Sequence, residues 1–243
     1  NLDIVSAHNS KPSQTFEMGI NKFTDWTDEE FNVLLGYKSS QRVKRGLTQG
    51  KHPKALPLSD DVKDWRTEGA VTDVKDQGNC GSCWAFSAVA AMEALNEFWN
   101  RYLIPMSEQQ LVDCCRIGTS QGCNGGEMID AFKYYAQGPA PKKKQPTTTV
   151  LESEYPYTGK DEICQKDIIL ASKSELDGIS HYDNITYDPT GQAMFESAYW
   201  NVISVGIWVG DAIRNYKSGI ITMQDCPNTN VNNHGVAIVG TGK

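Results

Sequence analysis

The sequence lacks any apolar stretch that could cross a membrane, and it lacks an excess of positive charge. A membrane-spanning helix needs about 20 predominantly apolar residues, and no run among the 243 residues approaches that length. Acidic residues outnumber basic ones by 30 to 23, which gives a formal net charge of −7. Nucleic acids and anionic membranes attract clustered Lys and Arg. We therefore expect neither a nucleic-acid partner nor a membrane partner.

Histidine is also scarce, and its positions argue against a metal site. The four histidines are His8, His52, His181 and His234. None lies three to five residues from another, which is the spacing that paired zinc ligands show. We expect no metal ion and no other cofactor.

Cysteine is the informative residue of this chain. Seven cysteines are too few for a small protein held together mainly by disulfides and too many to be incidental. Because the number is odd, at least one thiol has no partner within the chain. That thiol is either reactive or bonded to something outside this sequence.

Hydrophobic periodicity predicts a long helix in the middle of the chain. Trp84, Ala88 and Ala91 recur at three- and four-residue steps. A helix is therefore expected to begin after Ser82 as its N-cap and to end before Pro105, which cannot continue it. Cys83 would then lie in the first turn.

The remaining elements indicate an α+β fold. Shorter helices are expected at "SEQQLVDCC" and "EMIDAFKYYAQ", and β-branched strands at "NVISVGIWV" and "HGVAIVG". Near the start, "TDEEFNVLLG" begins with a capping box of Thr27 and Glu30. Residues 36–60 are typical of an exposed linker and residues 139–150 of a surface loop. Helices first and strands later favour two lobes over an alternating βαβ sheet.

The pair Cys80 and Cys83 admits three interpretations. A redox dithiol would follow a central strand of an alternating βαβ pattern, which is not found here. A zinc site would need a second pair of ligands. A nucleophile would need one thiol at a helix N-terminus and a distant imidazole to share its proton. Cys83 and His234 are candidates for these two roles.

Several ordered motifs then identify a family. "QGNCGSCWAFS" resembles the active-site segment of the papain-like cysteine peptidases, and "NHGVAIVG" resembles their histidine segment. "LVDC", "GCNGG" and "YPYTGKDEIC" are similar to family landmarks in the family's order, and "DWRTEGAVTDVKDQG" resembles the start of the mature enzyme. We expect residues 58–243 to form a papain-like peptidase domain, truncated at its C-terminus.

The start of the chain resembles the inhibitory propeptides of cathepsin L-like members, through "GINKFTD". The four motif positions are held by Gly19, Asn21, Phe23 and Asp25. Residues 1–36 are therefore expected to be the C-terminal part of an inhibitory propeptide, and residues 37–57 a linker with the processing region. The resemblance implies a two-lobed papain-like fold, with an N-terminal helical lobe, a C-terminal β-barrel-like lobe and a cleft between them.

The resemblance also implies roles for single residues. Cys83 is expected to be the nucleophile, His234 the general acid and base, and Gln77 the donor of an oxyanion hole. A thiolate–imidazolium ion pair is expected between the first two. The implied disulfides are Cys80–Cys123 and Cys114–Cys164. The implied substrate-binding residues are Gly125, Gly126, Met128, Gly206, Gly235 and Trp84.

The pocket for the second residue before the cleaved bond is expected to prefer an apolar side chain, because its implied residues are small or apolar. The family's orienting asparagine and the partner of Cys226 are expected beyond Lys243. Cys115 has no family counterpart and is expected to be a buried thiol.

The predicted function is that of a cathepsin L-like cysteine endopeptidase precursor, which hydrolyses polypeptides through an acyl-enzyme. Its own propeptide is expected to inhibit it and to be released in acid as carboxylates such as Asp25 lose their charge. We expect a monomer in a lysosome or vacuole, or a secreted protein, whose signal peptide is absent from this fragment. The alternatives are an inactive papain-like binding protein and a propeptide-type protease inhibitor.

Overall fold

The computed structural model describes most of the chain. The described residues are 1–39, 62–137, 148–172, 179, 182–185, 190–226 and 231–242. Nearly all of the predicted linker and of the predicted 139–150 loop therefore lie outside the described residues.

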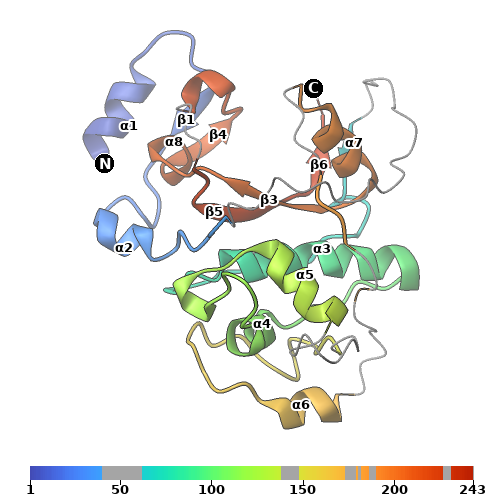
Figure 1. Ribbon diagram of the computed structural model, residues 1–243. Coiled ribbons are helices and arrows are strands. Elements are labelled where there is room, and N and C mark those ends of the chain that lie inside the picture. Colours follow the sequence, from blue (N-terminus) through green and yellow to red (C-terminus); the bar gives the residue numbers. More distant parts are fainter. Residues whose placement is uncertain are drawn as a thin grey trace.

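One half of the molecule is helical, as predicted (Figure 1). Its elements are α3 (Cys83–Asn100), α4 (Glu108–Cys114), the 3₁₀-helix η1 (Gly122–Asn124), α5 (Met128–Gln137) and α6 (Lys166–Ala171). Their apolar faces enclose one core, whose largest side chains are Trp84, Leu111, Tyr134 and Tyr135. This core fixes the start of α3, the element that carries Cys83.

The start of α3 differs from its prediction in one respect. Ser82 is the N-cap residue, but its side chain makes no capping hydrogen bond. Its Oγ instead lies 2.6 Å from the hydroxyl of Tyr157. The helix ends at Asn100, where Arg101 adopts a left-handed conformation, so the chain turns before it reaches Pro105.

The other half contains most of the strands. Its elements are β2 (Lys63–Asp64), α7 (Gln192–Trp200), β3 (Ile203–Ile207), α8 (Asp211–Arg214), β4 (Tyr216–Gly219), the 3₁₀-helix η2 (Met223–Asp225), β5 (His234–Ile238) and β6 (Gly240–Thr241). The predicted strands β3 and β5 pair antiparallel, with Ile207 opposite His234. Among the described residues the strands form three two-stranded sheets, and the barrel-like closure of this lobe stays a prediction.

The two halves meet where β5 lies along α3 (Figure 1). Ser87 of α3 donates a hydrogen bond of 2.7 Å to the carbonyl of Val236, and Ser204 of β3 donates one of 2.7 Å to the carbonyl of Ser87. These bonds hold the first residue of β5 beside the first turn of α3.

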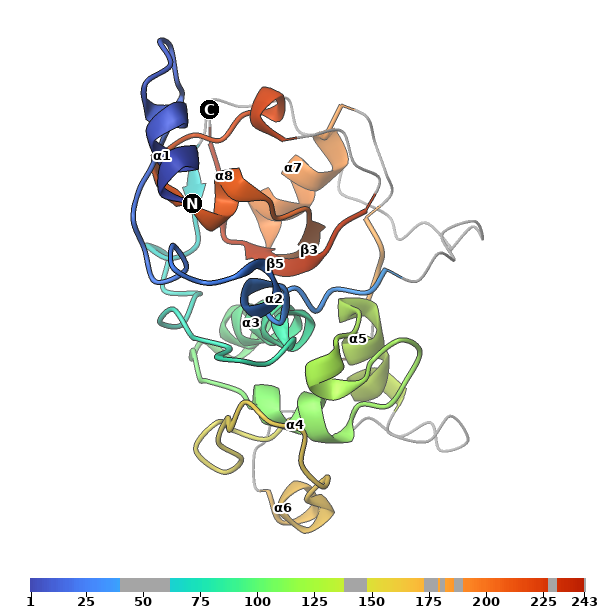
Figure 2. The same cartoon turned by 90° about the vertical axis from the view of Figure 1, so that its left-hand side faces the viewer.

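Residues 1–39, called the N-terminal segment below, pack first on β4 and α8 and then on this junction. They form α1 (Leu2–Asn9), β1 (Phe16–Met18) and α2 (Asp28–Asn32). The predicted capping box of Thr27 and Glu30 is present at α2. After α2 the segment passes between β5 and α3 (Figure 2).

The strand β1 was not predicted. It pairs antiparallel with β4, and its three residues are too few for a periodic signal in the sequence. None of the helices in the described ranges is both long and apolar enough for a membrane span.

Candidate active site

Cys83 is the first residue of α3 and has a free thiol. Its residue is 1 % exposed. Burial raises the pKa of this thiol, while the backbone N–H groups of Gly235, Gly36 and Trp84 act in the opposite direction. Burial prevails, so the thiol is favoured over the thiolate in this arrangement.

His234 opens β5 and directly precedes Gly235, whose N–H interacts with the thiol of Cys83. Burial lowers the pKa of its imidazole, and a contact with the backbone of Leu34 raises it by less. Its Nδ1 is buried and has no hydrogen-bond partner in the described part of the chain. The neutral ring is therefore favoured.

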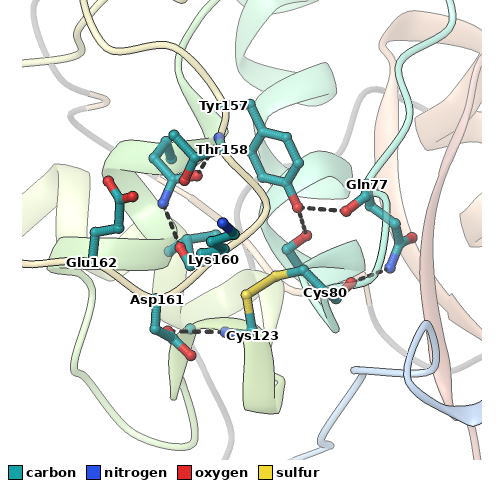
Figure 3. Close-up of a disulfide and its surroundings, with 12 residues drawn as sticks. Gln77, Cys80, Cys123, Tyr157, Thr158, Lys160, Asp161 and Glu162 are labelled. Carbon is teal, nitrogen blue, oxygen red and sulfur yellow. Dashed lines mark hydrogen bonds between the residues drawn. A yellow bond between two sulfur atoms is a disulfide. The ribbon is translucent and has the colours of Figure 1, made fainter.

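Gln77 lies in the loop before α3, and its side-chain amide has two acceptors. Nε2 donates hydrogen bonds of 2.7 Å to the carbonyl of Cys80 and 3.0 Å to the carbonyl of Leu34. The backbone of Gln77 is held as well, because the Tyr157 hydroxyl donates to its carbonyl at 2.7 Å (Figure 3). The amide of Gln77 is thus fixed before any substrate is bound.

The N-terminal segment occupies the space between these residues. Gln77 and His234 line one cavity of about 440 Å³ together with Leu34 and Leu35. The carbonyl of Leu34 therefore lies where two polar side chains converge. A carbonyl in this position resembles the group that a peptidase has to polarise.

Gly36 is the residue of the N-terminal segment whose backbone contacts the thiol. Its N–H contributes to the environment of Cys83, and its α-carbon lies so near Gly81 that a Cβ atom would collide with the Gly81 carbonyl. Only glycine fits at position 36 without displacing one of the two backbones.

The next residues of the segment pair with Gly126. Gly126 donates to the carbonyl of Gly36 at 2.8 Å and accepts from the N–H of Lys38 at 2.9 Å. On the opposite side, the N–H of Tyr37 donates to the carbonyl of Asn233 at 3.1 Å. The segment is therefore held in an extended form between both halves of the molecule.

The neighbours of Gly126 explain why it carries no side chain. A Cβ atom there would lie 2.7 Å from the ring of Trp84, which is fully buried and donates to the carbonyl of Gly122 at 3.1 Å. Gly125 has a φ of +102°, and a Cβ on it would collide with the carbonyl of Gly36. Trp84 thus lies behind the glycines and not at the surface that binds the segment.

The comparisons with known proteins agree with this arrangement. Residues 59–243 match the papain family cysteine proteases, and residues 1–31 match the cathepsin propeptide inhibitor domain. The chain belongs to the papain family of cysteine proteases. Vignain of Vigna mungo is 38 % identical over 248 residues, which are 99 % of this chain and 64 % of vignain. Human cathepsin L2 is 36 % identical over 246 residues, which are 100 % of this chain and 69 % of the relative.

A solved structure shows the same fold. The proform of the ragweed pollen allergen Amb a 11, a cysteine protease, matches with a TM-score of 0.81 and 30 % identity, over 100 % of this chain and 65 % of that one. This chain spans 64 % of the length of vignain and of two Arabidopsis thaliana relatives, the probable cysteine protease RDL2 and the thiol protease aleurain. The papain-like α+β fold preceded by a propeptide domain is thus established.

The cysteines of this papain-family chain separate into two groups. Disulfides join Cys80 to Cys123 and Cys114 to Cys164, as the resemblance implied. Cys83, Cys115 and Cys226 are free, and burial raises the pKa of the Cys115 thiol to about 11. The dithiol and zinc interpretations of Cys80 and Cys83 are wrong, because Cys80 is bonded to Cys123.

The predicted pocket residues lie on two sides of one region. Met128 and Gly206 line a cavity of about 570 Å³, and the ring of Tyr37 lies in it. Gly235 lies between Cys83 and Met128. A Cβ atom added to it would lie 3.2 Å from the Met128 sulfur and 3.2 Å from the Cys83 carbonyl oxygen.

Three of the four propeptide-motif residues make contacts that hold the N-terminal segment in place. Gly19 donates to the carbonyl of Asn215 at 2.8 Å, and Asn21 donates to the carbonyl of Arg214 at 2.8 Å. Phe23 packs edge to face on Trp26 and on Phe31, with centroids 5.2 and 5.3 Å away. Asp25 is exposed and forms neither a hydrogen bond nor an ion pair with any residue that the structure describes.

Arg214 is the contact that sequence reasoning missed. Its guanidinium is 5 % exposed and donates to the carboxylate of Asp28 at 2.7 Å and to the carbonyls of Trp26 and Phe23 at 2.5 and 3.3 Å. It also stacks 4.7 Å from the ring centre of Phe31. No local pattern predicts this site, because Arg214 and its partners are separated by more than 180 residues in the chain.

Proposed function

We propose that the protein is the precursor of a cysteine endopeptidase and that the N-terminal segment keeps it inactive. The observation that supports this most directly is the carbonyl of Leu34 on the amide of Gln77, at the turn that presents the thiol of Cys83. A peptide carbonyl is already bound where the chemistry would take place.

The proposed reaction gives each of three groups a role. The imidazole of His234 takes the proton of the Cys83 thiol, the sulfur attacks the carbonyl carbon of a bound peptide, and the side-chain amide of Gln77 with the N–H of Cys83 stabilises the oxyanion. The imidazole then gives this proton to the leaving amine as the C–N bond breaks and the thioester forms. Water, deprotonated by the same ring, then hydrolyses the thioester and restores the thiol.

Burial supports a physical account of inhibition. The N-terminal segment excludes water from Cys83 and His234, which raises the pKa of the thiol and lowers the pKa of the imidazole. Both shifts oppose the ion pair expected for the active enzyme. Removing the segment rehydrates the two groups and favours thiolate and imidazolium.

The substrates in this proposal are extended polypeptides, which would pair with Gly126 as Gly36 and Lys38 do. The two disulfides suit an oxidising compartment, so the protein is assigned to a lysosome or vacuole or to the secreted fraction. Residues 37–57 would contain the processing site, and the active form is a monomer.

Labelling of the natural full-length protein tests the proposal. Acid-activated protein is treated with a peptide that carries a thiol-directed epoxide, and the modified residue is identified by mass mapping. We expect labelling at Cys83, none in Cys83→Ser, and slow labelling before activation. Equal labelling of Cys226, or equal rates before and after activation, would contradict the proposed site.

A further inference from the structure

Glu127 is a buried carboxylate, and one of its oxygens lacks a hydrogen-bond partner among the described residues. It lies between Gly126 and Met128 and is 8 % exposed. Its Oε2 is fully covered and finds no donor in the described ranges of the chain. A buried charge is costly unless a donor or an opposite charge compensates it. The catalytic proposal above gives this carboxylate no task.

Glu127 lines the cavity of about 570 Å³ that receives Tyr37. Most of the other walls are apolar, among them Met92, Leu95 and Phe132. Asp183 is a second carboxylate on the wall, and no Lys or Arg lines the cavity among the described residues. The cavity therefore combines an apolar lining with negative charge.

Tyr37 shows how a side chain reaches this cavity. Its backbone pairs with Gly126, and its ring passes Gly206, where a Cβ atom would lie 2.6 Å from the ring. The pKa of its phenol is raised first by burial and second by the charge of Glu127. The phenol has a hydrogen bond with Ser39, and Oε2 of Glu127 receives no hydrogen bond from Tyr37.

We propose that Glu127 selects substrates that place a cationic side chain, Arg or Lys, in this cavity. This inference rests on the proposed peptidase function and names its substrate class. The apolar stem of such a side chain would lie along the apolar walls, and its charged end would donate to Glu127. The purely apolar preference expected from Met128, Gly206 and Gly235 is thereby revised.

Three peptide substrates test the selectivity on acid-activated full-length protein. They differ only in the residue that enters the cavity, which is arginine, its neutral isostere citrulline, or leucine. Peptides are made with this residue second or third before the cleaved bond, so that the register is determined in the same assay. The variants are Glu127→Gln, which keeps the shape, and Glu162→Gln, which removes one exposed carboxylate elsewhere.

We expect the parent to cleave the arginine peptide about 10- to 100-fold more efficiently than the citrulline peptide, as measured by kcat/KM, because the hydrogen bond involves two charges. Glu127→Gln should bring this ratio close to one, mainly because kcat/KM for the arginine peptide falls. Glu162→Gln should retain the ratio. A ratio near one in the parent, or a ratio that Glu127→Gln does not change, would overturn the inference.

Binding separates this inference from the peptidase proposal. The affinities of the same peptides are measured on Cys83→Ser protein whose N-terminal segment has been removed by an added protease. A preference for arginine that depends on Glu127 would support the inference even if no peptide were cleaved, whereas equal affinities would refute it. Absence of cleavage in the parent would refute only the peptidase function.

Discussion

The two parts of the N-terminal segment bind the papain-family domain in different ways. Residues 16–32 use side chains, among them Phe23 and Asp28, and a strand that pairs with β4. Residues 34–38 contact the active site mainly through backbone atoms, with Tyr37 as the exception. The first part thus binds through contacts that depend on its own sequence, and the second part lies in the proposed active site through contacts that depend little on sequence.

The largest effect should come from the site in which the second part lies. Gln77→Ala removes one donor to the oxyanion, which costs about 2.7–4 kcal/mol and lowers kcat of the activated enzyme about 100- to 1,000-fold. Folding should be unchanged, since Gln77 is partly exposed. Gln165→Ala, an exposed glutamine far from Cys83, is the control. Near-normal turnover of Gln77→Ala would remove Gln77 from the catalytic site.

The next largest effect should come from the first part. Arg214→Leu leaves Asp28 and the carbonyls of Trp26 and Phe23 without their donor. Hydrogen bonds to charged groups are worth about 1.5–3 kcal/mol, so the segment should dissociate at least about tenfold more readily. The rate at which full-length protein activates at a fixed pH measures this.

The control for Arg214→Leu is Arg66→Leu, which removes an exposed arginine whose ion-pair partner among the described residues is Asp64. If both variants activated at the parent rate, the anchoring role of Arg214 would be disproved.

Acid should weaken the binding of residues 16–32 before that of residues 34–38. Lys217 lowers the pKa of Glu17, and Lys22 lowers the pKa of Asp76, and both pairs join the segment to the domain. A carboxyl whose pKa is lowered by docking stabilises the docked state above its free pKa and ceases to do so as the pH falls. These contributions should fade below about pH 4.5.

The double variant Glu17→Gln, Asp76→Asn tests this dependence. Both pairs are exposed, so we expect activation at pH 6 to accelerate by no more than about fivefold. The ratio of the activation rates at pH 4 and pH 6 should decrease. Asp25→Asn should leave the profile unchanged, because Asp25 has no partner in the described part of the chain. A shifted profile in Asp25→Asn alone would restore the role first expected for that residue.

The smallest effect should be a change in the pKa of the Cys83 thiol. The rate of its alkylation against pH should have a lower midpoint after the N-terminal segment is removed, because burial no longer raises the pKa of the thiol. Measurements on full-length protein before and after activation compare the two states. Identical midpoints would mean that the segment inhibits by steric exclusion alone.

Much of this arrangement could be predicted from local patterns. The steps between Trp84, Ala88 and Ala91 gave α3, and β-branched runs gave β3 and β5, because burial of one face imposes a period on the sequence. Resemblance to the family motifs also assigned Gln77, Cys83 and His234 to one catalytic site. These signals lie within a few residues of one another or within known motifs.

Other features depend on contacts that no local pattern contains. Arg214 anchors the N-terminal segment although it lies more than 180 residues away in the chain. Leu34 contacts Gln77 through its backbone carbonyl, a group that every residue has, so its side chain gives no signal of the contact. The expected ion pair of Cys83 and His234 is disfavoured here because burial acts on both groups. Ser82 does not cap α3, because Tyr157 engages its hydroxyl.

The hydroxyl of Tyr157 has a further consequence (Figure 3). Burial raises the pKa of this phenol to about 12, so it retains its single proton at any physiological acidity. The Gln77 carbonyl can only accept, so that proton must point toward it, and the Ser82 hydroxyl must in turn point toward the phenol oxygen. Gln77 and Ser82, which both precede the nucleophile in the chain, are thereby linked through one hydroxyl with a fixed direction of hydrogen bonding, and loss of that hydroxyl would release both.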